Sequence, residues 1–358
     1  MYNNKNVLGK PIITVFPGYA NTQTLYIDKN DGYQWFLQNF FLMIYNYNEE
    51  ENAICSEFMN LSEIRFAQKY NIEMQNILCL PVESYCLPRT FVEANFKMID
   101  FVEKSIDDGY CVHLYLDRRF IRIFNEKRKY SHQTFITGYD KQKRILYFND
   151  YFNRGIYQEA YCTYEEFIEA YNNNEFFYDL DDGICYEYEI HDKIALLKYK
   201  ESFSFEFSEQ KFADDISKYL GEEKFELPFI PKIHNMKNDS CIVVQNTDGQ
   251  QILMQYHDRK LSDGNIIDLR QICLFIDHKI ALKHKIAYLV KNNKMFSSDN
   301  IVSVENLIKK ANIIKAAFIK HNVTLKSSKT TRDNIATLFV EINDMEKELL
   351  LTIRDLLG

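Results

Sequence analysis

The chain has 358 residues, of which 46% are hydrophobic and 15% aromatic, which predicts a packed core in two domains or in one large domain with an appendage. A net charge of −8 disfavours nucleic acid as a general partner, because phosphate binding requires a basic surface. The sequence shows no signal-peptide pattern and no apolar run of about 18 residues, so we expect a cytoplasmic protein without membrane contact.

The first hundred residues are predicted to be mainly helical. Short apolar runs favour strands over 12–16 and 76–82. The pattern over 32–47 is apolar nearly all round and follows Asp31 as a possible cap, which predicts a buried helix. Helical spacing of apolar residues predicts further helices over 52–69 and 91–106.

Strands dominate the next hundred residues. We expect strands at 110–116, 132–138 and 144–148, with 139–143 as a short hairpin connection, and one or two more within 184–199. Thr163 and the acidic residues after it predict a short helix over 163–171. The first 200 residues are therefore predicted to be α+β, with antiparallel strands after the first helices.

The rest of the chain is predicted to be mostly helical. We expect a helix over 205–220, a hairpin within 241–256 around Asp248-Gly249, and long helices over 266–292, 303–321 and 331–357. The apolar stripes of the long helices predict a bundle, with a protein-docking face or a homodimer as the alternatives. The predicted division is a first domain over 1–200, a connecting segment over 201–265, and a helical bundle over 266–358.

The eight cysteines are scattered and form no C-x-x-C pair. Most of them lie in apolar patterns, so we expect reduced thiols in the core and no zinc or other metal site.

His132 and Asp150 are the candidate catalytic residues. They lie about equally far from the predicted turn, so we expect them at the same end of adjacent strands. A carboxylate beside a histidine orients the ring, which can then take a proton from a nucleophile. The alternatives are a structural histidine and an ordinary loop aspartate.

A resemblance to a known family adds to this interpretation. The segment from Tyr110 to Tyr171 resembles the papain-like fold of bacteriocin-processing cysteine peptidases and, more closely, the N-terminal domain of the butirosin biosynthesis protein H family. The similar stretches are Cys111-Val112-His113-Leu114-Tyr115-Leu116-Asp117, a histidine leading into Phe135-Ile136-Thr137-Gly138-Tyr139-Asp140, a strand ending in Asp150, and Tyr164-Glu165-Glu166-Phe167. Asp268-Leu269-Arg270, His278-Lys279 and Ile286-Ala287-Tyr288-Leu289 are similar to the helical tail of long forms found beside peptide-assembly enzymes.

The resemblance implies a nucleophilic cysteine at the start of the first buried helix. In this chain Gly32, Tyr33 or Gln34 occupies that position, and none of them can do the chemistry of a thiol. Cys55 is the nearest downstream thiol and the possible substitute. Loss of the thiol removes covalent acyl transfer, because the members of such a catalytic unit act together.

A basic cluster precedes His132 in a chain that is acidic overall. Its members are Arg118, Arg119, Arg122, Lys127, Arg128 and Lys129. The cluster is either a solvated loop or a landing site for an acidic carrier protein or for the phosphate of its phosphopantetheine arm.

Two functions of different classes follow from the resemblance. The first is acyl or peptidyl transfer in nonribosomal peptide-type biosynthesis, from a carrier-bound thioester to an amine acceptor, with His132 as base or acid and Asp150 as its orienting partner. The second is a catalytically inactive homologue that binds a peptide or product as an accessory or immunity protein. An active protease is the weakest alternative, since proteolysis most needs the missing thiol. No cofactor is expected apart from phosphopantetheine on a carrier-bound substrate.

Overall fold

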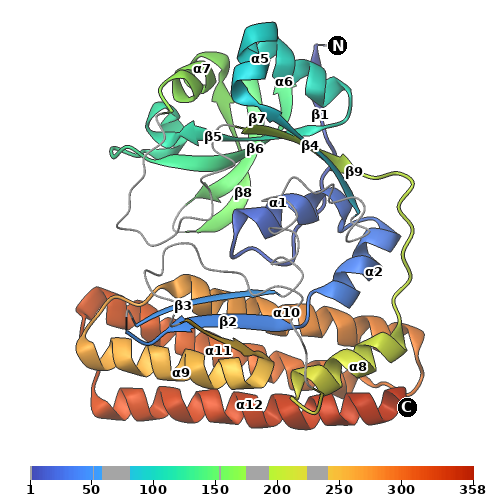
Figure 1. Cartoon of the computed structure of the whole chain (residues 1–358), viewed down its shortest axis with the longest axis vertical. Coiled ribbons are helices and arrows are strands. Elements are labelled where there is room, and N and C mark those ends of the chain that lie inside the picture. Colours follow the sequence, from blue (N-terminus) through green and yellow to red (C-terminus); the bar gives the residue numbers. More distant parts are fainter. Residues whose placement is uncertain (1, 51, 59–80, 153–154, 175–192, 224–240) are drawn as a thin grey trace. The chain divides into compact units, whose positions relative to one another are not determined.

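The computed structural model describes residues 2–50, 52–58, 81–152, 155–174, 193–223 and 241–358 (Figure 1). It has the α+β class that the sequence predicts. Two compact units are present: the first comprises Met1–Gly32 and Ile72–Ser204, and the second comprises Tyr33–Asn71 and Phe205–Gly358.

This division differs from the expected one in the place of residues 33–71. The expected boundary at 200 lies close to the observed change after Ser204, but 33–71 belongs to the second unit, and 201–265 forms no separate segment. The reason is strand pairing, since β2 (Met43–Asn48) pairs with both β3 (Ala53–Phe58) and β10 (Cys241–Gln245). A pairing across almost 200 residues leaves no trace in a local hydrophobic pattern.

An antiparallel sheet forms the centre of the first unit. In spatial order, its described strands are β4 (Val82–Pro88), β9 (Lys193–Tyr199), β5 (Cys111–Asp117), β6 (Ser131–Asp140), β7 (Ile145–Phe152) and β8 (Ile156–Thr163). The short β1 (Asn3–Lys5) pairs with the end of β6. Strands β5, β6 and β7 confirm the predicted strands at 110–116, 132–138 and 144–148, whereas β8 was not predicted.

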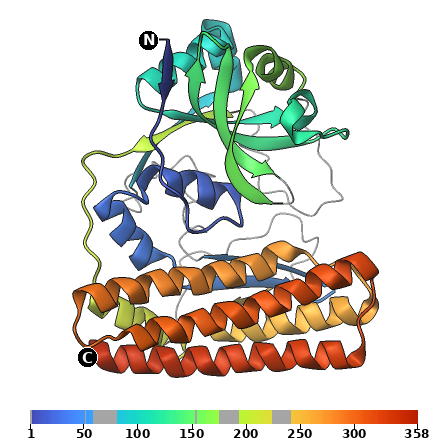
Figure 2. The same cartoon turned by 180° about the vertical axis from the view of Figure 1, so that it is seen from behind.

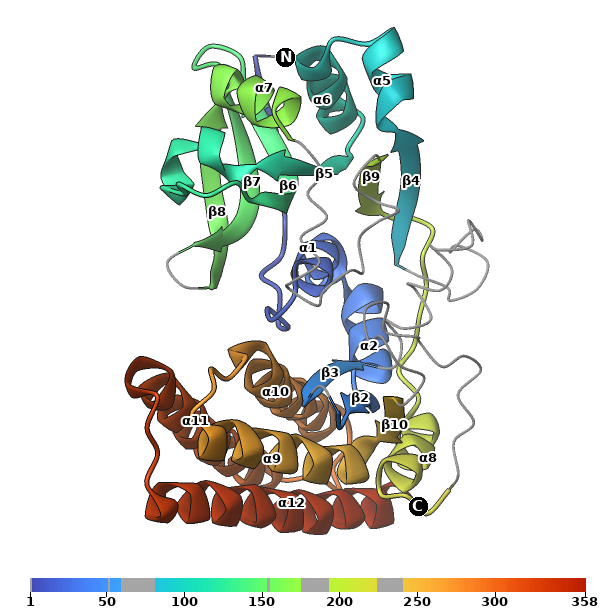
Figure 3. The ribbon, with the colours of Figure 1, turned by 60° about the vertical axis from the view of Figure 1, so that its left-hand side comes forward.

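One face of this sheet carries a core of apolar side chains with α5 (Arg89–Asn95), α6 (Met98–Asp107) and α7 (Tyr164–Asn172). Figure 3 shows α6 and α7 above the strands. Thr163 caps α7 in a capping box with Glu166, as the helix-start pattern predicts. The continuous helix expected over 91–106 is divided between α5 and α6.

The alternation of side chains along β6 and β7 shows on which face of the sheet His132 and Asp150 lie. Leu116 lies directly opposite His132, so both side chains share the face of the apolar core. Asp150 follows Phe148 by two residues on β7 and lies on that face as well. The opposite face carries Tyr157, whose hydroxyl donates a hydrogen bond to Asn21 Oδ1 of α1 (Pro17–Tyr26) at 2.7 Å.

The second unit combines long helices with the small sheet β10-β2-β3. Its helices are the greater part of α2 (Asn30–Asn39), α8 (Glu209–Tyr219), α9 (Asn246–Asp263), α10 (Leu269–Asn292), α11 (Ser298–Thr324) and α12 (Lys329–Leu357), and Figure 2 shows the last three from behind. The predicted stripe of α11 is confirmed, because Leu307, Ala311, Ile314 and Phe318 are all fully buried.

Several expected elements near the start of the chain are wrong. Residues 12–16 form no strand, and a helix that was not predicted, α1, begins at Pro17. The helix expected over 32–47 ends at Asn39 and gives way to β2, and residues 53–58 of the expected helix 52–69 form β3. Fully buried strands have continuous apolar runs that periodicity alone cannot distinguish from buried helices.

The hairpin expected around Asp248-Gly249 is also wrong, because α9 covers these residues. Asn246 begins this helix with a left-handed φ of 52°, and its Oδ1 accepts a hydrogen bond from the Met43 backbone N–H at 3.0 Å. A tertiary hydrogen bond therefore outweighs the local turn signal. Residues 59–69, 76–80 and 184–192 of other predicted elements lie outside the described residues.

Among the helices that the structure describes, none combines the length and the apolar character needed to cross a bilayer.

Candidate functional site

The first unit brings His132 and Asp150 together. His132 Nδ1 lies 3.4 Å from Asp150 Oδ1 at the same end of β6 and β7. The Asp150 side chain is 1% exposed and the His132 side chain is 20% exposed, so the imidazole covers a buried carboxylate. The expected juxtaposition is therefore present, although 3.4 Å is slightly long for a strong hydrogen bond.

Arg118 links the two residues. Its Nη2 forms an ion pair with Asp150 Oδ1 and lies 2.6 Å from His132 Nδ1. The guanidinium carbon lies 4.5 Å from the ring centroid of Phe124 and 5.3 Å from that of Tyr130, and the Tyr130 ring is stacked on His132. Since Nη2 carries two hydrogens, it can direct one at the carboxylate and one at the imidazole.

This arrangement fixes the tautomer of His132. An arginine is always charged and can only donate, so at 2.6 Å Nδ1 must present its lone pair to Nη2. The Gln133 carbonyl oxygen also lies 2.9 Å from Nδ1, but an unprotonated nitrogen has no hydrogen to donate to it. Because arginine cannot lose its proton, we assign the Arg118 contact as the hydrogen bond and place the ring proton on Nε2.

The assigned tautomer is the reverse of the one that nucleophilic catalysis uses. In a catalytic triad the acid accepts a hydrogen bond from Nδ1–H, which leaves the Nε2 lone pair to take the nucleophile's proton. Here Nε2 carries the proton, and the charge of Asp150 is neutralised by Arg118. The site, as folded, can donate a hydrogen bond from His132 but has no base at Nε2.

No hydrogen bond within the described part of the chain joins a thiol to His132. Cys111 and Cys162 are buried in the same unit, and burial raises the pKa of the Cys111 thiol to about 12 and that of Cys162 even further. Cys55, the possible substitute, lies in β3 of the second unit, where its Sγ is 3.9 Å from Glu57 Oε1. These thiols have the environment of structural cysteines.

The three residues at the vacated position have structural contacts. A Cβ at Gly32 would overlap the backbone carbonyl of Tyr26, so this glycine permits a close approach of two chain segments. The Tyr33 hydroxyl lies 3.1 Å from His284 Nδ1, and burial together with the nearby Tyr288 raises the pKa of Tyr33 to about 12. Gln34 Oε1 accepts hydrogen bonds from the Phe207 backbone N–H and from Tyr288.

Helix α1 precedes α2 in the chain, so the first buried helix begins earlier than the sequence predicted. If the nucleophile belongs at the start of the first buried helix, that place passes to Pro17, Gly18 and Tyr19, and again no cysteine is present. The Asn21 side chain of α1 reaches the sheet on the face opposite to Asp150. No hydrogen bond or ion pair that the described residues make joins α1 to His132.

The members of the basic cluster differ in their ion pairs. Arg118 is paired with Asp150, Arg119 binds both carboxylate oxygens of Asp117, and Arg122 is paired with Glu166. Lys129 occupies a half-buried position. The side chains of Lys127 and Arg128 are exposed and form no ion pair with any described residue, so they are the charges that the loop presents to solvent.

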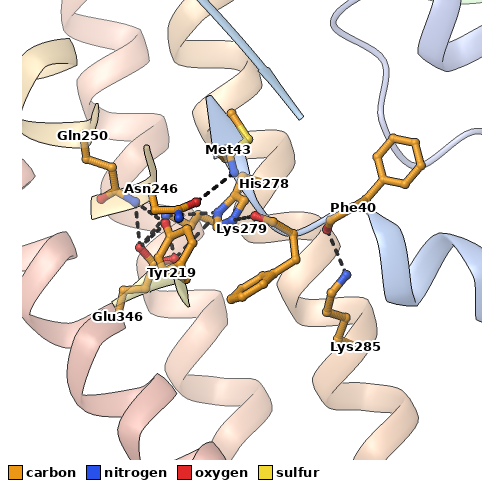
Figure 4. Close-up of polar contacts among 10 residues, drawn as sticks. Phe40, Met43, Tyr219, Asn246, Gln250, His278, Lys279, Lys285 and Glu346 are labelled. Atoms are coloured by element: carbon orange, nitrogen blue, oxygen red, sulfur yellow. Dashed lines mark hydrogen bonds and ion pairs between the residues drawn. The ribbon is translucent and has the colours of Figure 1, made fainter. Parts of the chain in front are cut away.

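The second unit contains a buried polar network that was not predicted (Figure 4). Lys279 Nζ lies 2.6 Å from both carboxylate oxygens of Glu346, which also accept hydrogen bonds from Tyr219 and Gln250. His278 Nε2 donates to the Phe41 carbonyl at 2.8 Å. Burial alone would raise the pKa of Glu346, but Lys279, with His278 and Gln250, lowers it, so the carboxylate stays ionised.

Lys285 is a second buried cation in this unit. Its Nζ donates to the Phe40 carbonyl at 2.8 Å (Figure 4), and burial lowers its pKa to about 7 although the nearby Asp215 acts in the opposite direction. A signal for the network was present in the sequence, since Glu346 follows Ile342 by four residues on the apolar stripe of α12. A charge on a buried stripe indicates a buried partner.

No group of histidine, cysteine and acidic side chains within the described ranges could hold a metal ion. Comparison with protein-family models gives no match for the chain, and none of the curated proteins matches it.

Proposed function

We propose that the chain is a catalytically silent binding protein of natural-product biosynthesis, whose first unit is of the papain-like type and holds a peptide or acyl product without transferring it. The observation that carries this proposal is the position of Arg118 Nη2, which neutralises Asp150 and occupies Nδ1 of His132. With the ring proton on Nε2 and no thiol bonded to the ring within the described residues, the general-base step of covalent transfer has no acceptor.

Direct acyl transfer to an amine is the second candidate. It is favoured by the 3.4 Å separation between His132 and Asp150 and by the partial exposure of the imidazole. In this alternative the ring would assist an incoming amine without a covalent intermediate.

The two functions are separated by one assay. The protein is incubated with an acyl-carrier substrate and a panel of amines, and product formation is compared between wild type and His132→Ala. We expect the wild type to form no more product than the buffer control and to bind the product saturably in calorimetry. Turnover by the wild type that is lost in His132→Ala would overturn the binding proposal and establish transfer.

A carrier protein is the partner that the exposed charges suit. An acidic carrier protein that binds this loop would contact Lys127 and Arg128. Charge reversal of both residues should therefore weaken carrier binding and reduce the salt dependence of that binding. The matched control reverses Lys320 and Lys347, two exposed lysines of the second unit, and so changes the net charge by the same amount. Equal loss in the control would show that only the overall charge matters.

A further inference from the structure

Arg118 uses few of its hydrogen-bond donors. Both of its polar contacts involve Nη2, while Nε is buried without a partner among the described residues. A guanidinium has five N–H donors in a planar fork that matches the oxygens of a carboxylate or a phosphate. The side chain is 11% exposed, so it is not completely closed off from solvent.

The surroundings of Arg118 favour an anion. The backbone N–H of Arg118 donates to the Tyr130 carbonyl at 3.0 Å, which closes the loop that carries Lys127 and Arg128. These two exposed charges raise the local potential, while Asp117 is already neutralised by Arg119. Phe124 and Tyr130 flank the guanidinium and limit the directions in which it can turn.

An anion at Arg118 would change the charge balance of the site. The ionisable groups around His132 are Arg118 from η1 (Arg118–Phe120), Asp150 from β7, Tyr130 from the loop, and the Asp117–Arg119 pair at the end of β5. If an anion draws the guanidinium away, Asp150 remains buried with His132 as its nearest cationic partner. A buried carboxylate without a counter-charge is costly, so the imidazole would take up a proton and donate Nδ1–H to Asp150.

We propose that the first unit binds an anionic group, a carboxylate or a phosphate monoester, at Arg118, and that its binding protonates His132. This inference rests on the proposed binding function and names the chemical class that the site would hold. One anion binds and one proton is taken from solvent, so the proton cancels the charge of a carboxylate and one of the negative charges of a phosphate monoester. Asp150 Oδ2, which is buried without a hydrogen-bond partner among the described residues, provides a further acceptor for the imidazolium.

The test follows the imidazole nitrogens of His132 by NMR while acetate or inorganic phosphate is added to the full chain. Without an anion, we expect the Nε2–H tautomer, because Arg118 Nη2 donates to Nδ1. With a saturating anion, we expect the pKa of His132 to rise by at least one unit. A response to both anions indicates a general anion site, whereas a response to phosphate alone indicates a site selective for a phosphate group.

Three variants complete the test. Arg118→Met should abolish anion binding, and Asp150→Asn should retain it without the rise in pKa. Arg122→Met, which removes an exposed arginine from the same loop, should change neither property. Wild-type data decide the matter even if a variant fails to fold: an anion that binds without any change at His132 would overturn the inference.

Failure of this inference differs from failure of the proposed function. A wild-type protein that binds product but shows no anion response at His132 overturns the anion site alone. A wild-type protein that transfers acyl groups to amines overturns the binding function, whatever the anions do.

Discussion

Glu346 of α12 and Lys279 of α10 form an ion pair that is wholly buried, with Nζ 2.6 Å from each carboxylate oxygen. The pair joins the last helix of the chain to the centre of the second unit, and Tyr219 and Gln250 complete the hydrogen bonds of the carboxylate. A buried ion pair of this kind does not by itself indicate added stability. Removal of one partner is nevertheless destabilising, because it leaves the other charge buried without a counter-charge.

Glu346→Ala should therefore lower the free energy of unfolding of the second unit by about 3–5 kcal/mol. Urea unfolding followed by the fluorescence of Trp35, the single tryptophan, measures this unit directly. The control Glu348→Ala removes an exposed carboxylate two residues along the same helix and should cost no more than about 0.5 kcal/mol. Similar losses in both variants would contradict the role assigned to the pair.

Acid should destabilise the second unit through two buried histidines. Burial lowers the pKa of His257 and of His278 to about 3, and Lys279 adds to the effect at His278. Below pH ~6.5 the unfolded chain binds protons that the folded chain does not, so stability falls as the pH falls from there towards 3, by about 1.4 kcal/mol per pH unit for each histidine.

The ring of His257 lies beside Phe318 and Phe339, so His257→Phe is a conservative replacement in an aromatic environment. Urea unfolding at several pH values between 4 and 7 should show about half the wild-type slope in this variant. An unchanged slope would mean that His257 does not contribute to the acid sensitivity.

The buried Lys285 predicts that the stability of the second unit also changes with pH above neutrality. Its folded pKa of about 7 lies well below that of an unfolded lysine, so stability should rise as the pH increases from 7 towards 9.5. Lys285→Met should flatten this rise, whereas Lys291→Met, an exposed lysine of the same helix, should retain it. Thermal unfolding at pH 7.0, 8.0 and 9.0 gives the comparison, and a wild-type curve without any rise would refute the assignment.

Gly32 offers a test of its structural role. Because a Cβ there would overlap the Tyr26 carbonyl, Gly32→Ala should lower the free energy of unfolding by about 1–3 kcal/mol. At Gly18 in α1 no heavy atom lies within 4 Å of an added Cβ, so Gly18→Ala should leave stability unchanged or raise it by about 0.5–1 kcal/mol. Urea unfolding followed by circular dichroism measures both, and a neutral Gly32→Ala would mean that the contact is loose.

The parts of the fold that depend on local patterns could be predicted. The stripe of α11, the capping box at Thr163 and the strands around His132 follow from spacings of two to four residues along the chain. The prediction failed at β2, where burial on both faces makes a strand resemble a buried helix. It failed at β3 because the pairing of β3 with β2 is a tertiary contact. It failed again at Asn246, where a hydrogen bond to a residue 203 positions away starts a helix at an expected turn.

The sequence by itself determined that His132 and Asp150 come to one end of neighbouring strands, because both lie about equally far from the short turn. A register shift between Ile136 and Gly138, which was not predicted, then sets the faces on which their side chains lie. Only the tertiary structure decided what the pair can do. The guanidinium of Arg118 enters from a loop between two strands and occupies Nδ1 of His132, which leaves the ring proton on Nε2, the nitrogen that a base would need. Its position depends on the rings of Phe124 and Tyr130 and on the burial of Asp150, and such three-dimensional packing is not encoded in any local spacing.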